Sequence, residues 1–402
     1  MIWRRSIDSN PITMYLPLLS VFIIIMSFYG KSSVLFWIGI LSGLSTVLSS
    51  RYIDFITRRL SYNNNRQTIR MFPGDQDQWK VQIANRSRLP VFSGNLTFLL
   101  DNQCSIKNLQ PIEERRNVNE YSVPFTFLPN EPKSLTFNIT GNRRGVAKVS
   151  MLSLTVYDLM NATTGKLVND RLVQSELIVY PTLLPVGGVQ QLIQSRQGSR
   201  VVPSSLFEDR NLVVGTKDYE AGDSFQRIHW KASARMEELQ TKIYEKAMTQ
   251  TWTIFLNVIF DPKEAARLGE SELLEKQISY TAYLCQFAFQ QNIPFEIYIN
   301  IKTRGRIPYM HLEKGEGKSQ LAKALELLAR LNNSSIKVPM HRVLSMFERR
   351  HFSSSVLILV GDDQTDADYY ERFNRQGMDL YKVFLDESSA SLDRLEKRRA
   401  IS

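Results

Sequence analysis

The stretch SSVLILVG, residues 354–361, is almost wholly apolar. A strand needs such a run when helices cover both of its faces. Three similar runs lie nearby: TWTIFLNVIF (251–260), PFEIYINIK (294–302) and LYKVFLD (380–386), and helix-like segments separate them. Alternating strands and helices of these lengths predict a parallel, doubly wound α/β sheet within residues 212–402.

In sheets of this kind the functional edge lies beyond the carboxyl ends of the strands. Asp261 follows the first of these strands, and Asp362 and Asp363 follow SSVLILVG. A metal site of the Asp-x-Ser-x-Ser type would offer one carboxylate and two hydroxyls to a hard cation. The residues present are DPKEA (261–265), which lack both serines and add the charge of Lys263. We therefore predict no metal, no cofactor and no catalytic residue.

A metal-dependent hydrolase remains an alternative to the non-enzymatic function that we derive below. In that alternative, the carboxylates at this sheet edge would converge with Asp223. A phosphate loop is not expected at GEGKS (315–319), because that motif requires glycine where this chain has Leu312. The segment is predicted to be the start of a helix. Cys104 and Cys285 stand alone in the sequence and predict two reduced thiols.

Residues 1–60 predict a transmembrane helical hairpin. No charged residue occurs between Asp8 and Lys31, or between Lys31 and Arg51. Each stretch is long enough for a span, because about 20 apolar residues cross a hydrocarbon core of about 30 Å. The small residues of the second span would suit close helix packing in lipid; they are Ser42, Gly43, Ser45 and Ser49. A cleaved signal peptide and two buried core helices are the alternatives.

Basic residues flank this apolar region on the outside. Residues 1–66 hold seven Lys/Arg and two Asp, which is +5 of the formal net charge of +10. Arginines precede the first span and follow the second, with only Lys31 between them. The positive-inside rule then predicts a multi-pass protein of the cell membrane with both termini and the soluble domains in the cytoplasm. Such membrane-proximal charge argues against a nucleic-acid partner.

Residues 66–180 predict a β-sandwich of immunoglobulin type. Short segments such as KVQIAN (80–85) and LTFNIT (135–140) alternate apolar and polar residues, as half-buried strands do. Turn signals punctuate them, among them GNRRG (141–145). Residues 181–211 are rich in Pro, Gly and Ser and predict a linker with one short helix around VQQLIQS (189–195).

The segment YEAGDSFQRIHWKASAR, residues 219–235, concentrates charged and aromatic residues. We predict a helix that Asp223 or Ser224 caps. Its basic face would carry Arg227, Lys231 and Arg235 at i, i+4 and i+8. Such cations repel unless acidic groups meet them. One interpretation is a buried ion-pair clamp that joins the linker to the α/β domain, with Asp223 paired to Arg227 or with Glu238 and Asp218 as the acidic groups. The other is a docking surface for an acidic partner, and both could hold.

This segment resembles the signature of the DUF58 family. The residues that carry the resemblance are Tyr219, Gly222, Asp223, Arg227, Ile228, Trp230, Ser233, Ala234 and Arg235. The order of a membrane hairpin, a β-rich segment, the motif and an α/β domain is also similar. The missing Asp-x-Ser-x-Ser departs from the family pattern.

The resemblance implies that the motif and a von Willebrand A-like α/β domain together occupy residues 212–402. Members have no assigned enzymatic activity and are often encoded beside MoxR-type AAA+ ATPases. We therefore expect a membrane-anchored, non-enzymatic scaffold or assembly factor that docks a protein partner of that type. The expected binding residues are Tyr219, Gly222, Asp223, Arg227, Trp230, Ser233 and Arg235.

Overall fold

The computed structural model describes most of the 402 residues. The described ranges are 4–9, 15–63, 66–160, 163–168, 175–194, 208–246, 251–260, 262–303, 307–349, 356–361, 367–385 and 389–395. The chain forms two compact units, which are Met1–Thr182 with Leu328–Leu331, and Leu183–Leu327 with Asn332–Ser402. The chain is therefore multidomain, with an apolar helical region, a β-sandwich and a mixed α/β sheet.

The first unit contains the predicted β-sandwich. Its larger sheet has the order β1 (Arg4–Ser9), β11 (Thr163–Val168), β10 (Gly145–Tyr157), β5 (Val91–Asp101), β8 (Val118–Phe127) and β7 (Glu113–Glu114). Attached to β10 is β12 (Glu176–Val179), which pairs in parallel with β3 (Thr68–Met71). The second sheet is β2 (Leu60–Asn63), β4 (Gln76–Asn85), β9 (Pro132–Gly141) and β6 (Cys104–Ile106). The immunoglobulin-type connectivity stays a prediction.

Aromatic side chains from both sheets fill the core of the sandwich. Trp79 of β4 lies 5.2 Å from Phe98 of β5 and 5.3 Å from Phe137 of β9, measured between ring centroids. All three side chains are buried. The alternating pattern of β4 explains this arrangement, because every second residue from Trp79 to Asn85 faces inward.

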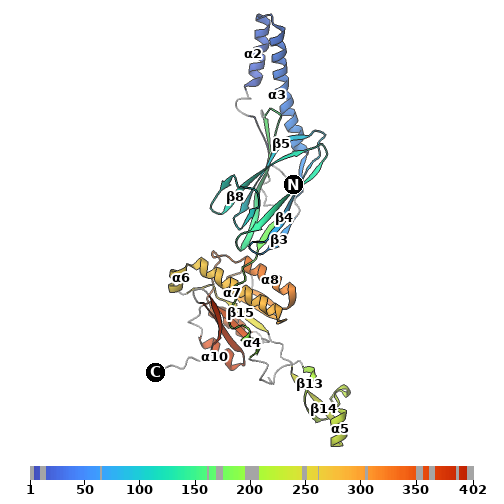
Figure 1. Ribbon diagram of the computed structural model, residues 1–402, viewed down its shortest axis with the longest axis vertical. Coiled ribbons are helices and arrows are strands. Elements are labelled where there is room, and N and C mark those ends of the chain that lie inside the picture. The colour runs from blue at the N-terminus through green and yellow to red at the C-terminus, as the bar shows by residue number, and fades with distance from the viewer. Residues whose placement is uncertain are drawn as a thin grey trace. The chain divides into compact units, whose positions relative to one another are not determined.

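Two apolar helices, α2 (Leu16–Tyr29) and α3 (Ser33–Arg59), come after β1 in the sequence and before the other strands of the sandwich. Figure 1 shows them projecting side by side from one end of the sandwich. They meet at Gly39 and Gly43 of α3, which approach Ser20 and Ile24 of α2. The small-residue prediction was therefore correct for Gly43 but wrong for Ser49, which belongs to the contact with the sandwich.

One helix among the described residues, α3, is long and apolar enough to cross a membrane. Only 11% of its most apolar window is buried inside the structure, so it differs from a core helix. A signal sequence near the N-terminus has the same composition. The other apolar helix, α2, has 14 residues and a length of about 21 Å. The predicted first span is thus shorter in the structure than a full crossing, and a multi-pass arrangement is not supported by helix length.

The last two turns of α3 belong to the sandwich. Ile53 and Ile56 are fully buried in its core, and Thr57 is buried beside them. Arg5 of β1 and Arg58 both form ion pairs with Asp54. Residues 4–9, predicted as a flank of the membrane hairpin, are a strand that pairs with β11. The boundary at residue 60 therefore does not separate a membrane part from a soluble part.

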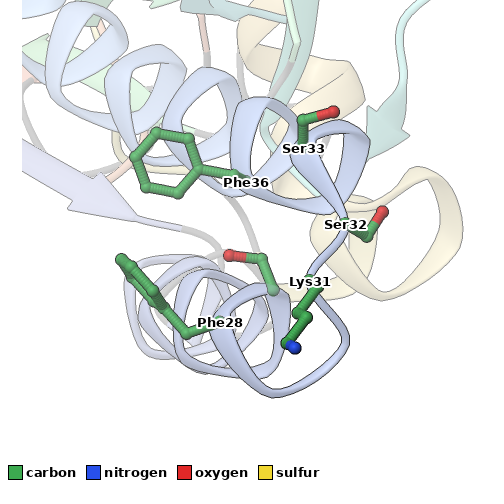
Figure 2. Close-up of a pocket in the computed structure, with 6 residues that line it drawn as sticks. Phe28, Lys31, Ser32, Ser33 and Phe36 are labelled. Atoms are coloured by element: carbon green, nitrogen blue, oxygen red, sulfur yellow. The ribbon is translucent and has the colours of Figure 1, made fainter.

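A shallow hollow of about 340 Å³ lies at the tip of the helix pair. Figure 2 shows Phe28 of α2 and Phe36 of α3 facing one another there, with Lys31 in the turn between the helices. The two rings pack edge to face with centroids 5.9 Å apart. Lys31 adopts a left-handed backbone conformation with φ of 46°, which closes the tight connection.

The second unit contains the predicted α/β sheet, but the sheet is mixed. Its order is β17 (Met310–Gly315), β16 (Phe295–Ile299), β15 (Trp252–Leu256), β18 (Val356–Val360), β19 (Asp379–Leu385) and β20 (Ala390–Arg394). The four inner strands are parallel, whereas the edge strands β17 and β20 run antiparallel to their neighbours. The prediction of an all-parallel sheet was wrong at both edges. A von Willebrand A-like relationship stays a prediction.

Helices cover both faces of this sheet, as predicted. On one face, Phe287 of α7 (Glu270–Gln290) stacks on Trp252 of β15. On the other, α9 (Met340–Glu348) and α10 (Ala367–Arg375) share a core with Phe255 and Tyr298. The remaining helices of this domain are α6 (Pro262–Leu268) and α8 (Gly317–Ala329). GEGKS leads into α8 through Gly317, whose φ is 76°, so the predicted helix start is confirmed.

Part of the predicted linker is ordered within the second unit. Gly187 pairs with Ser391 of β20, and Val186, Val189 and Leu192 are buried. The predicted short helix is α4 (Gln191–Gln194). Residues 195–207 lie outside the described residues.

Candidate functional site

The predicted binding segment lies in the loop of a β-hairpin. Its strands are β13 (Glu208–Asp218) and β14 (Gln240–Lys246), paired antiparallel with Lys217 opposite Thr241. Between them come the short 3₁₀ turn η1 (Phe225–Arg227) and the helix α5 (Trp230–Met236). The described part of this two-stranded sheet has no third strand. All seven predicted binding residues are therefore part of one hairpin.

The continuous helix predicted from residue 223 is wrong. Ile228 has φ of −64° and ψ of 130°, which is extended backbone, and it forms a bridge with Thr241 of β14. Its side chain is buried. Arg227 therefore precedes the break, and only Lys231 and Arg235 share a helix. The bridge to β14 is a tertiary contact, and it outweighs the local helical spacing.

His229 caps α5, a role that sequence reasoning missed. Its ring Nδ1 accepts a hydrogen bond from the backbone N–H of Ala232 at 3.1 Å. Its own backbone N–H donates to the carbonyl of Gln240 at 2.7 Å. Asp223 and Ser224, the predicted caps, make no side-chain capping bond to either helix. A histidine cap is unusual, since Ser, Thr, Asp and Asn are preferred.

Asp223 does form a clamp, but its cation is Lys217 and not Arg227. The Lys217 Nζ lies 3.0 Å from Asp223 Oδ2. The same oxygen accepts bonds from Thr241 Oγ1 at 3.2 Å and from the backbone N–H of Glu220 at 3.3 Å. The hydrogen bond from Lys217 holds the pKa of Asp223 below its ordinary value, and Asp223 raises the pKa of Lys217. The carboxylate therefore joins the loop to both strands.

Ser233 and Tyr219 also hold the loop. Ser233 Oγ accepts a bond from the backbone N–H of Gln240 at 2.9 Å and donates to the His229 carbonyl at 3.2 Å. The backbone N–H of Tyr219 donates to the Leu239 carbonyl at 2.8 Å, and its ring lies 5.8 Å from that of Phe225. Gly222 has open space where a Cβ would stand. Ser233 and Tyr219 therefore shape the loop's backbone, whereas no contact requires a glycine at position 222.

Several other side chains of the loop face outward. Phe225 is 71% exposed and Trp230 is 68% exposed. Met236 and Leu239 are exposed near them in the sequence. Lys231 and Arg235 of α5 are exposed too, and among the described residues no carboxylate pairs with either. We call Phe225, Trp230, Lys231, Arg235 and Met236 the loop surface.

The carboxylates of the hydrolase alternative, Asp261, Asp362 and Asp363, lie outside the described residues. The described part of the same sheet edge is occupied by amides. Asn300 Nδ2 donates to Asn257 Oδ1 at 2.7 Å, and Asn300 Oδ1 accepts from the backbone N–H of Val258 at 2.7 Å. Within the described ranges, no three His, Cys, Asp or Glu side chains gather as metal ligands.

A second polar cluster, which sequence reasoning missed, lies in the α/β domain. Glu296 of β16 accepts from Thr253 Oγ1 at 2.7 Å and lies 3.4 Å from His311 Nε2. Burial would raise the pKa of Glu296, but hydrogen bonds from His311 and Thr253 outweigh it and keep the pKa below its ordinary value. His311 stacks on Tyr298 at 4.2 Å. The strand pairing that brings them together carries no local sequence signal.

No family model matches this chain, and no curated protein matches it. Among solved structures, a non-cellulosomal cohesin from Archaeoglobus fulgidus is 13% identical, with 34% of this chain and 99% of that chain covered at a TM-score of 0.20. The cohesin CaCohA2 of Clostridium acetobutylicum is 16% identical, with coverages of 30% and 88% and a TM-score of 0.19. Likenesses this weak say nothing about what this chain binds.

Proposed function

We propose that this chain is a membrane-anchored, non-enzymatic scaffold that docks a protein partner through the loop surface. The observation that carries the proposal is that one set of loop residues holds the loop in place while another set is exposed to solvent. Asp223, Ser233 and Tyr219 are engaged in holding its backbone, whereas Phe225 and Trp230 are left in solvent. Exposed aromatic and cationic side chains are those that most often dominate binding at protein interfaces.

The anchor in this proposal is the pair α2 and α3. Their outward side chains are large and apolar, including Phe22, Ile25, Trp37, Leu41, Leu44 and Leu48. An apolar surface of this size is rarely left in water. The end of α3 supplies Ile53 and Ile56 to the sandwich core, so removal of this segment as a signal sequence would open that core. These features support a retained anchor.

The finer topology belongs to the same proposal. α2 and α3 enter the bilayer as a hairpin with Lys31 at the far side, and the positive-inside rule keeps both soluble units in the cytoplasm. The partner we propose is an AAA+ ATPase of the MoxR type. That part rests on the resemblance of the motif to the DUF58 signature and on no contact seen in the structure.

Binding to a purified MoxR-type ATPase from the same organism tests the docking role. The full-length protein in nanodiscs would carry Trp230→Ala or Arg235→Glu, both of which change exposed side chains. Ile336→Ala, at a position 67% exposed in the α/β domain, is the matched control. We expect loss of binding for the first two variants only. Equal binding by all four proteins would remove the loop surface from the docking role, and no binding by the unaltered protein would remove the ATPase.

A further inference from the structure

The turn between β10 and β11 exposes two large apolar side chains. Leu159 is 76% exposed and Met160 is 69% exposed. The residue before them, Asp158, is buried and accepts a hydrogen bond from Ser49 of α3. Asp158 also accepts from the backbone N–H of Thr163 at 3.1 Å. The described residues at the two ends of the turn, Asp158 and Thr163, are therefore fixed to α3 at the level of Ser49.

Ser49 marks the end of the apolar part of α3. The 18 residues from Ser33 to Ser50 contain no charged side chain and have a length of about 27 Å. Arg51 follows and is exposed. If the apolar part occupies the hydrocarbon, Ser49 and the turn attached to it lie where the hydrocarbon meets the headgroups.

A second element of the sandwich reaches α3 close to this level. The ring of Phe92 in β5 stacks on Tyr52 at a centroid distance of 6.4 Å, and Phe92 is half-exposed. Tyr52 Oη donates to the Pro90 carbonyl at 2.7 Å. Aromatic side chains with one polar end are enriched at the headgroup level of membranes.

We propose that this end of the sandwich is a second membrane contact, formed by Leu159, Met160, Tyr52, Phe92 and Arg51. The two apolar side chains of the turn enter the interfacial layer, the aromatic pair lies among the headgroups, and Arg51 faces lipid phosphate. The occupant is the bilayer that receives α3, because hydrogen bonds set the turn at the end of the apolar helix surface. The inference rests on the proposed anchorage by α2 and α3.

Fluorescent labelling of single introduced cysteines tests this contact in the full-length chain in liposomes. The native Cys104 and Cys285 are both buried, and burial raises the pKa of each thiol, so neither competes for a maleimide label. Leu159→Cys reports on the turn, and Val47→Cys, on the exposed apolar part of α3, reports on the anchor. Ile112→Cys is the matched soluble control, because Ile112 is 68% exposed. Its backbone N–H donates to the carbonyl of Glu120, and Glu120 lies opposite Leu99 of β5, far along the strand from the turn.

Quenching by bromine on lipid chains and by aqueous iodide then separates the outcomes. We expect bromine to quench the labels at positions 159 and 47, and iodide to quench the label at position 112. Bromine quenching at position 47 with iodide quenching at position 159 would overturn the second contact and leave the anchor intact. A label at position 159 shielded from both quenchers means that protein covers the turn, which also overturns it. Iodide quenching at all three positions would overturn the anchorage itself.

Discussion

Gly43 of α3 faces Ser20 of α2 so closely that a Cβ on the glycine would stand 3.6 Å from the Cβ of the serine. This separation falls within the range of disulfide-bonded cysteines, which is about 3.5–4.5 Å. We predict that Ser20→Cys combined with Gly43→Cys forms a disulfide under mild oxidation. A gel-shift assay on the purified protein measures it. The control pair is Ser20→Cys with Leu41→Cys, since Leu41 is exposed; equal bonding by both pairs would contradict the packing.

The neighbouring position Gly39 is tighter still. A Cβ there would lie 2.5 Å from Ile24 Cγ1 and 3.1 Å from the Ser20 carbonyl. We expect Gly39→Ile to force α2 and α3 apart and to abolish the disulfide of the double variant Ser20→Cys with Gly43→Cys. Gly30→Ala is the control, because its new Cβ would meet only the Met26 carbonyl at 3.4 Å. Full disulfide formation in the Gly39→Ile background would show that the helices do not approach at this glycine.

Asp158 predicts a stability effect in the sandwich. Replacement by Ala leaves the backbone N–H of Thr163 without its acceptor and leaves Ser49 Oγ only the longer 3.4 Å bond to Thr163 Oγ1. A buried donor left unsatisfied costs about 1–3 kcal/mol. We expect the free energy of unfolding to fall by about that amount in denaturant titrations. Asp8→Ala, at an exposed carboxylate of β1, should change it little; equal losses would mean that Asp158 does not hold α3.

The Lys217–Asp223 pair predicts a pH window for the hairpin. The pKa of Asp223 is lowered in the folded state, so its contribution is complete above the ordinary value of 3.8 and is lost as the pH falls through the folded value. The pKa of Lys217 is raised, so its contribution is lost as the pH rises through a value above 10.5. The protection of the β14 amides from hydrogen exchange, corrected for the intrinsic pH dependence of exchange, should fall at both extremes. Asp223→Asn should remove the acid-side change, whereas Glu238→Gln should retain it.

Glu296 predicts a loss of stability in the α/β domain. Glu296→Leu leaves the Thr253 hydroxyl and the His311 ring without their shared acceptor. We expect a loss of about 1–3 kcal/mol in the free energy of unfolding at neutral pH. Glu296→Gln should lose less, because its amide oxygen still accepts from Thr253. An unchanged denaturant midpoint for Glu296→Leu would show that the contacts among Glu296, Thr253 and His311 add nothing to stability.

Sequence patterns predicted the features that depend on local periodicity. The apolar runs correctly predicted the strands β15, β16 and β18, and the alternation of apolar and polar residues correctly predicted β4 and β9. Contacts between distant segments escaped detection. The strand β1 is RRSIDS, a charged segment that pairs only because β11 offers an edge. Likewise, β17 is the polar segment MHLEKG at the edge of its sheet.

The candidate site shows the same division. The motif located the loop surface, but helical spacing joined Arg227 to Lys231 and Arg235 across a break at Ile228. The true partner of Asp223 is Lys217 on a strand, which no spacing rule links to it. Local sequence patterns indicate which side chains lie on the same helix or strand. An ion pair between two elements depends instead on how the chain folds back to bring those elements together.

The helix α3 passes without interruption from the apolar region into the core of the sandwich, where Ile53 and Ile56 are enclosed and Asp54 is paired. Helices that cross lipid adjust to bilayer thickness by changing their inclination. Because the end of α3 is packed rigidly into the β-sandwich, a change in the inclination of α3 would rotate the β-sandwich by the same angle. With α3 anchored in a bilayer as proposed, the β-sandwich would therefore lean further toward the lipid in a thinner membrane, and its orientation would report membrane thickness.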